Sequence, residues 1–386
     1  MIVKKIRLIV FGVLVLCLVL VLASCGKSSE TASEGLIYSA YKDGTCQVSG
    51  IGVCTDTRVV IPSLSPAGDL VIGIKSDAFR DCSSITSISI PDSVVRIPQD
   101  AFADCTELEY NIRGGARYLG NRGNPYVALI EVIDKSVTTF EIPAETKGIA
   151  GGAFRNCASL SAITIPEKVS YSYPAFSGCT SLESVEWNAK DCTIPLYVNE
   201  SFFCDCTALS SVTFGDTVRT IPAYLFENCS SLTSLEIGAS VTRIEGGAFA
   251  GCSSISSVTL PDTLVRIGPG AFERCSSLSS VTIPENVSSL GSSAFSSCTS
   301  LVSINIPNGV KEVPFNAFSN CTSLETVDLG SGVTTLRDVC FGYCPALSRI
   351  NYAGTQAQWN AITKGTYWDL DSGSYTVYCS DGEIGK

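Results

Sequence analysis

The chain has 386 residues and a formal net charge of −11, from 37 acidic and 26 basic side chains, and it contains no histidine. An acidic chain is poorly suited to nucleic acid, whose phosphates need a basic face, so we expect no nucleic-acid partner. The lack of histidine removes Ser-His and Cys-His nucleophile activation and histidine-ligated metals. We therefore expect a protein that is not an enzyme, with no catalytic residues, no metal and no cofactor.

Residues 1–24 have the features of a secretory signal peptide. Lys4, Lys5 and Arg7 precede an apolar run of 15 residues, 8–22. The sequence Leu-Ala-Ser-Cys that ends at Cys25 resembles a bacterial lipobox, which implies a lipid on Cys25 and a membrane-anchored protein in the cell envelope, outside the cytoplasm. An uncleaved signal-anchor helix is the alternative, but 15 residues are few for a hydrocarbon core of about 30 Å. Residues 25–35 would then be the lipidated cysteine and a polar tether.

Residues 36–75 predict an N-terminal cap with a first irregular coil. A turn signal lies between strand-like runs at 41–48, and residues 54–62 follow the repeat pattern without its phenylalanine. We expect repeats over 76–351, beginning with Phe79 and Phe102. The next Phe-x-x-Cys comes at Phe154, 52 residues later, and the extra stretch predicts a β-hairpin insert near 113–135.

The Phe-x-x-Cys motif recurs every 23 residues from Phe203 to Cys344. Counting each Phe as position 0, apolar residues occupy +6, +9, +11 and +18. Alternation over +8 to +11 predicts a short strand with one buried face, and a proline often follows it. The segment from +15 to +3 should return as turns and a short helical or 3₁₀ piece. A fixed period in the twenties indicates a solenoid, whose coils bury their apolar faces only when stacked.

Residues 248–261 read Ala-Phe-Ala-Gly-Cys-Ser-Ser-Ile-Ser-Ser-Val-Thr-Leu-Pro. This repeat resembles that of the BspA-like (treponemal-type) leucine-rich repeat surface lipoproteins, and the resemblance covers nearly all of the mature chain. It implies a right-handed leucine-rich-repeat solenoid, an α/β-type repeat of mostly parallel strands with turns and about 23 residues per coil. It also implies adhesion, with host matrix proteins, cell-surface proteins or glycans as partners.

Residues 352–386 depart from the repeat and predict a C-terminal cap. A short helix is expected over 355–362 and a closing hairpin around 375–379. The last coil of a solenoid exposes its core and needs a lid. Six aromatic residues can supply it: Tyr352, Trp359, Tyr367, Trp368, Tyr375 and Tyr378.

Nineteen cysteines need an interpretation in an exported protein. Cys17 leaves with the signal, Cys25 is the lipidation site, and eleven of the other 17 occupy position +3. Side chains of an in-register ladder point the same way, so we expect reduced thiols buried as small apolar groups. The six cysteines outside the ladder remain open, and a Cys46–Cys54 disulfide is one alternative: Cys46, Cys54, Cys192, Cys204, Cys340 and Cys379.

The outward strand positions +8 and +10 are mostly Ser and Thr, with the acids Glu186, Glu236 and Asp328 among them. Large aromatic residues lie elsewhere, at the insert, in one irregular coil and in the C-terminal cap: Tyr118, Tyr126, Trp187, Trp359 and Trp368. These eight residues are the candidate binding residues, although each aromatic can instead pack in the core. The alternative to a binding module is an envelope scaffold or spacer without a dedicated ligand, which the uniform Ser/Thr face keeps open.

Overall fold

The computed structural model describes residues 31–194, 201–203 and 205–385. The predicted signal peptide, Cys25 and the first half of the tether lie outside these residues, as does Cys204. Within the described ranges, no helix combines the length and apolar character needed to span a bilayer.

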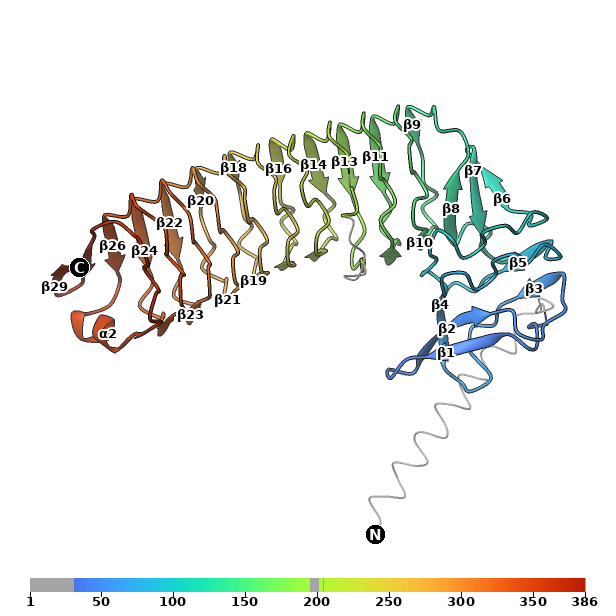
Figure 1. The fold of residues 1–386 in the computed structure, drawn as a ribbon, viewed down its shortest axis with the longest axis horizontal. Helices are drawn as coiled ribbons and strands as arrows, with labels where there is room; N and C mark the ends of the chain where they lie inside the picture. The colour runs from blue at the N-terminus through green and yellow to red at the C-terminus, as the bar shows by residue number, and fades with distance from the viewer. Residues whose placement is uncertain (1–30, 195–200, 204, 386) are drawn as a thin grey trace, which may run out of the picture.

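The predicted solenoid is present, and one long parallel sheet runs along it (Figure 1). Each coil adds one strand at positions +8 to +11. The first five strands are β9 (Thr139–Phe140), β11 (Ala162–Ile165), β13 (Ser184–Trp187), β14 (Ser211–Phe214) and β16 (Ser234–Glu236). A bridge from Glu236 to Thr259 links them to β18 (Ser257–Val258), β20 (Ser280–Val281), β22 (Ser303–Ile306), β24 (Thr326–Leu329) and β26 (Arg349–Tyr352).

The register of this sheet follows the sequence period. Val258 pairs with Val281, and Val281 with Ile304, so each residue lies beside its copy 23 positions away. All +9 side chains therefore point to the same side, into the core, and the +8 and +10 side chains point outward.

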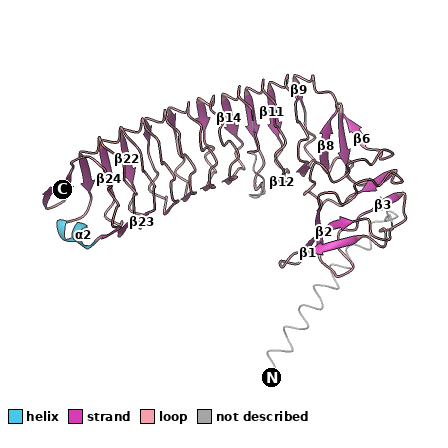
Figure 2. Ribbon diagram, in the orientation of Figure 1, coloured by secondary structure: helices cyan, strands magenta, loops and turns pink. Residues whose placement is uncertain are grey.

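The opposite wall of the coils is built from turns and short strands rather than helical pieces (Figure 2). Two-residue strands, at +17 and +18 in the regular coils, form further parallel ladders: β10 (Gly148–Ile149), β12 (Tyr171–Ser172), β15 (Thr220–Ile221), β17 (Arg243–Ile244), β19 (Arg266–Ile267), β21 (Ser289–Leu290), β23 (Glu312–Val313), β25 (Thr335–Leu336) and β27 (Thr363–Lys364).

A left-handed residue at position +2 turns the chain in each coil. Asp81, Asn156, Asn228 and Asn320 all have φ near +60°, and glycine takes this place at Gly251. Asn, Asp and Gly adopt this conformation at the lowest cost, which explains their frequency there. The turns also bond to the next coil, because the backbone N–H of Phe249 donates to the carbonyl of Ala271 at 2.9 Å.

The core of the solenoid is a column of phenylalanine rings. From Phe203 to Phe341, neighbouring rings lie 5.2–5.7 Å apart with interplanar angles of at most 14°. These side chains are fully or almost fully buried. Stacking and burial together make this column the main apolar support of the fold.

A ladder of thiols lies beside the phenylalanine column. Cys275 Sγ donates to the carbonyl of Phe249 at 3.3 Å, and Cys298 Sγ to that of Phe272 at 3.2 Å, in the preceding coil. The same bond recurs at Cys252, Cys321 and Cys344. The ladder cysteines Cys252, Cys275, Cys298, Cys321 and Cys344 are free thiols, as predicted for reduced thiols in the core.

The ladder thiols should resist alkylation while the protein is folded. Burial raises the pKa of the Cys275 and Cys344 thiols to about 12, because an apolar site disfavours the thiolate, which is the reactive form. At about pH 8, iodoacetamide should therefore modify the partly exposed Cys54 first and the ladder only after urea is added. Peptide mapping by mass spectrometry measures this, and ladder modification as fast as that of Cys54 in the folded protein would contradict it.

The N-terminal region packs as a unit of its own. Strand β1 (Ile37–Ala40) pairs antiparallel with β2 (Thr45–Gly50), which pairs parallel with β4 (Leu70–Ile74). Strand β3 (Arg58–Val60) pairs with β5 (Ser87–Ser89). These strands enclose one hydrophobic cluster, and the main solenoid encloses a second. Figure 1 shows β1 to β4 lying out of line with the stacked coils.

The insert joins the two units. Strands β6 (Asn111–Arg113), β7 (Ala116–Leu119) and β8 (Ala128–Val132) form an antiparallel meander, so the insert has one strand more than the expected hairpin. Strand β8 also pairs parallel with β10, which attaches the meander to the first coil of the solenoid. The border between the two cores falls in this insert, since Ala116 belongs to one and Leu119 to the other.

The C-terminal cap closes the last coil. Helix α2 (Gln356–Ala361) begins at a capping box formed by Thr355 and Gln358, and β28 (Thr376–Cys379) pairs antiparallel with β29 (Gly382–Gly385). Trp368 meets the end of the phenylalanine column, edge-on to Phe341 at 6.3 Å. The column thus ends against buried aromatic side chains.

Candidate functional site

A groove of about 1050 Å³ lies on the outward face of the sheet, over β9, β11, β13 and β14. Thr164 and Thr213 project into it at position +10 of their coils, and Phe140, Ile142 and Pro166 add apolar surface. The groove therefore combines hydroxyl groups with apolar patches, which suits a partner that is neither purely polar nor purely apolar.

The groove is strongly acidic. Four carboxylates line it, those of Glu141, Glu167, Glu186 and Asp216, and no Lys or Arg occurs among its described lining residues. Glu186 is held in place because its two oxygens accept hydrogen bonds from Thr164 Oγ1 and Asn188 Nδ2, each at 3.0 Å. The fixed position of Glu186 reduces the ordering cost of a contact with a partner.

The other two candidate acids occupy the same sheet face. Glu236 is exposed on β16 and is separated from Glu186 by Thr213 in the strand register. Asp328 lies further along, beside a smaller hollow of about 320 Å³, and accepts a hydrogen bond from Asn351 Nδ2 at 2.7 Å. The structure thus places the three acids along one face without bringing them into one site.

The candidate aromatic side chains are largely internal. Tyr118, Trp187, Trp359 and Trp368 are all less than a tenth exposed. Trp187 donates its indole N–H to the Ala189 carbonyl at 3.2 Å, and Trp359 packs against Trp368 with ring centroids 6.1 Å apart. These four side chains therefore pack in the core, which was the alternative for each of them. They offer little surface to a partner.

Tyr126 is the aromatic candidate that keeps some exposure. Its ring packs edge-on against Tyr118 with centroids 5.3 Å apart, and the Arg113 guanidinium lies 5.1 Å from its centroid. The Tyr118 hydroxyl is buried and has no hydrogen-bond partner in the described part of the protein. The two tyrosines therefore brace the insert.

Sequence reasoning missed the groove residues that follow the strands. Glu167 comes directly after Pro166, and Asp216 directly after Gly215, at the point where each strand ends. The strands are parallel, so their ends meet along one edge and bring these acids together. The sequence feature that could have revealed them is an acid directly after the Pro or Gly that ends a strand. These positions lie outside the +8 and +10 positions considered from sequence.

The described residues contain no group of three or more Cys, Asp or Glu side chains arranged to hold a metal ion.

Comparison with protein families shows a leucine-rich repeat, matched in 6 copies. The BspA type leucine rich repeat region matches over residues 68–121, 133–256 and 244–363. Comparison with curated protein sequences gives no match.

Several solved structures are similar to this chain. A leucine-rich repeat protein from Bacteroides ovatus is 24% identical, covers 90% of this chain and 100% of its own, and has a TM-score of 0.43. A leucine rich cell surface protein from Faecalibacterium prausnitzii is 26% identical, with coverages of 88% and 99% and a TM-score of 0.32. The pneumococcal vaccine antigen PcpA is 17% identical, with coverages of 91% and 98% and a TM-score of 0.44.

Proposed function

Because the chain belongs to the family of BspA-type leucine-rich repeat proteins, we propose that it is a non-enzymatic binding module of the bacterial cell surface. A lipid on Cys25 would anchor it to the membrane, and the solenoid would present its sheet face to protein or glycan partners outside the cytoplasm. The lipobox-like sequence that ends at Cys25 supports the anchor.

The acidic groove is the observation that carries this proposal. Its volume of about 1050 Å³ is large enough for several side chains or sugar rings of a partner. Four carboxylates and a set of hydroxyl groups give it a chemical character that the middle coils lack. A ligand face is expected to differ from the scaffold around it, and this part of the sheet does.

A spacer role is the second candidate, and the middle coils favour it. At position +8 they repeat the same small residue, Ser257, Ser280 and Ser303, all exposed. A uniform hydroxyl face without aromatic or arginine anchors is a poor source of binding hot spots. In this view the middle coils set the distance between the N-terminal anchor and the C-terminal cap.

Substitution of Thr164 tests the groove. Thr164→Trp fills the groove with a large ring and should weaken binding at least about tenfold, because a few well-packed central residues dominate most interfaces. The whole chain is measured by surface plasmon resonance against immobilised matrix proteins, mucins and glycans.

Thr259→Trp is the matched control, since Thr259 is exposed at the same +10 position in a coil that does not line the groove. Its binding should equal that of the unmodified chain. Saturable binding that survives Thr164→Trp would remove the groove from the proposal. An absence of saturable binding across the whole panel would leave the spacer as the better account.

A further inference from the structure

A second cleft, of about 850 Å³, lies where the N-terminal unit meets the solenoid. We call it the junction cleft. It is lined by five separate segments of the chain: 70–72, 92–95, 123–125, 145–147 and 168–170. The sequence period relates the first two segments to each other and the last two to each other, since Ser170 lies 23 residues after Lys147. It does not relate the two pairs, and the insert that separates them in the chain brings them together.

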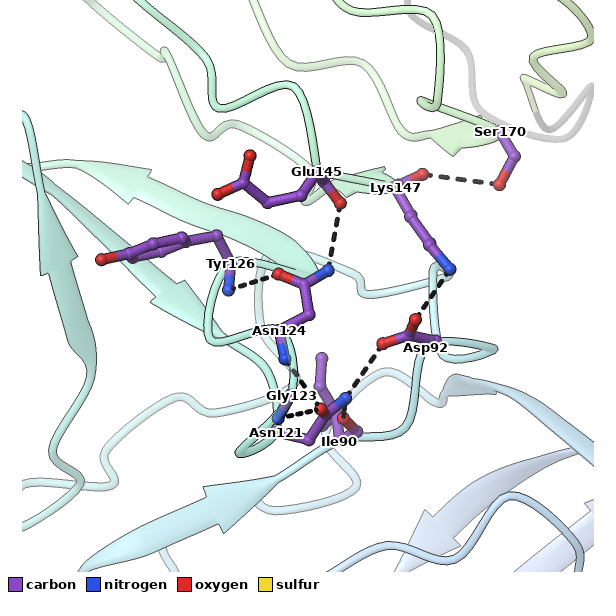
Figure 3. A network of polar contacts seen from close by, with 9 residues as sticks. All are labelled: Ile90, Asp92, Asn121, Gly123, Asn124, Tyr126, Glu145, Lys147 and Ser170. Atoms are coloured by element: carbon purple, nitrogen blue, oxygen red, sulfur yellow. Dashed lines mark hydrogen bonds and ion pairs between the residues drawn. The ribbon is translucent and has the colours of Figure 1, made fainter. Parts of the chain in front are cut away.

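A fixed polar network forms one side of the junction cleft (Figure 3). Asp92 accepts hydrogen bonds on both carboxylate oxygens, from Asn121 Nδ2 at 3.0 Å and from Lys147 Nζ at 2.9 Å. Asn121 also accepts from the backbone N–H groups of Gly123 and Asn124. Asn124 in turn donates to the Glu145 carbonyl at 3.1 Å.

The acids of the junction cleft are already neutralised. Burial alone would raise the pKa of Asp92, but hydrogen bonds from Lys147 and Asn121 and the charges of Lys147 and Lys168 outweigh it and lower that pKa. The Glu145 carboxylate is paired with Arg113 at 3.1 Å. A negative group entering the cleft would therefore meet no uncompensated carboxylate among these residues.

The junction cleft contains hydrogen-bond donors that are not fully used by acceptors of the protein. Lys168 lines it, is exposed, and has no hydrogen-bond or ion-pair acceptor in the described part of the chain. Ser170 makes only a long bond, 3.5 Å, from its hydroxyl to the Lys147 carbonyl. Lys147 donates one of its three ammonium protons to Asp92, so two remain for a ligand. A cluster of positively charged and hydroxyl donors without acceptors favours a ligand with an anionic acceptor.

Apolar side chains also line the junction cleft, and we call them its apolar wall. Leu70, Ile72, Val95 and Pro125 line the same cleft, and Leu70 is 40% exposed. An apolar wall beside polar groups suits a ring with one apolar face and polar substituents at its rim. A bare inorganic anion would leave this wall unused.

We propose that the junction cleft binds a sugar ring that carries a carboxylate, as uronic and sialic acids do. Lys168 pairs with the carboxylate, Ser170 and Lys147 donate to it or to the ring hydroxyls, and the apolar wall packs against the ring. A sugar acid is a glycan ligand of the surface module proposed above, and to that extent the assignment rests on that function. The site is separate from the acidic groove, with which it shares no lining residue.

The test uses the whole chain in detergent and saturation-transfer difference NMR with sodium glucuronate, sodium N-acetylneuraminate and glucose. We expect signals from both sugar acids with a Kd of roughly 1 mM, because a single ring makes few contacts. We expect no signal from glucose, because it lacks the carboxylate that pairs with Lys168. Lys168→Ala should weaken binding by about tenfold or more, since it removes a charge-assisted hydrogen bond. Ser170→Ala should weaken it by a few-fold.

Lys311→Ala is the control, because it removes the same charge from an exposed lysine in a distant coil. Its binding should match that of the unmodified chain. Absence of signal from both sugar acids, or equal binding by Lys168→Ala, would overturn the proposal. Full displacement of the sugar acids by an equimolar amount of inorganic sulfate would overturn the assignment of a sugar ring and leave a simple anion site.

The two sites can fail independently. Thr164→Trp should leave the sugar-acid signals unchanged, and Lys168→Ala should leave binding at the acidic groove unchanged. If the unmodified chain gives the sugar-acid signals but shows no saturable binding to the panel, the result would count against the proposed sheet-face function alone. The reverse pattern would count against the junction cleft alone.

Discussion

Replacement of Phe272 by alanine is expected to lower the free energy of unfolding by about 3–5 kcal/mol. The ring is fully buried between Phe249 and Phe295, with centroids 5.4 and 5.3 Å away. Its removal leaves a void that neighbours cannot fill, because the coil-to-coil hydrogen bonds fix the backbone on both sides. Urea denaturation of the whole chain, followed by circular dichroism, measures the loss.

Phe315→Ala is the matched control for this substitution. Phe315 lies in the same solenoid but is 49% exposed, so its loss should cost less than about 1 kcal/mol. Hydrogen exchange should also show that Phe272→Ala loosens the coils around residues 249–295 more than distant ones, since each coil contacts only its neighbours. Equal losses for Phe272→Ala and Phe315→Ala would contradict the role assigned to the column.

Gly291→Ala is the second substitution with a large expected effect, a loss of about 3 kcal/mol. A methyl group at Gly291 would lie 2.6 Å from Pro269 Cα and closer still to the backbone of Gly268, in the preceding coil. Backbone atoms cannot yield as a side chain can, because the N–H of Gly291 also donates to the Ile267 carbonyl at 2.8 Å. The strain therefore spreads into the ladder of β19 and β21.

The control for Gly291 is Gly385→Ala. No heavy atom outside its chain neighbours lies within 4 Å of a methyl group at that position, so its free energy of unfolding should change by less than about 0.5 kcal/mol. The same urea measurement applies to both. Gly291→Ala with the stability of the unmodified chain would show that adjacent coils separate more easily than this packing implies.

The regular coils could be predicted from sequence because their determinants are local and repeated. Phe249 stacks on its copy Phe272, and Val258 pairs with its copy in the next coil. Cys252 donates to a phenylalanine carbonyl of the preceding coil, and the same bond recurs one period later, so the period alone states which residues meet. The C-terminal helix was also predictable, since Thr355 and Gln358 form a capping box that can be read in four residues. These features need no knowledge of distant parts of the chain.

The acidic groove and the junction cleft could not be predicted in the same way. Glu141 reaches the groove from the strand that follows the insert, and Asp92 meets Lys147 across 55 residues that include the insert. The burial of Trp187 likewise depends on Phe202 from the next coil, whose ring lies 5.5 Å away. Each of these contacts is set by the irregular segments, where the period gives no register.

The spacing of the coils has a consequence for how the molecule can change in length. From Phe249 to Phe341 each ring of the column stacks on its copy 23 positions away, and the joints between coils are chemically alike. A duplication or deletion of one whole 23-residue block would bring together surfaces that already fit. The gene can thus lengthen or shorten its product in steps of about 4.8 Å, carrying both terminal caps along unchanged.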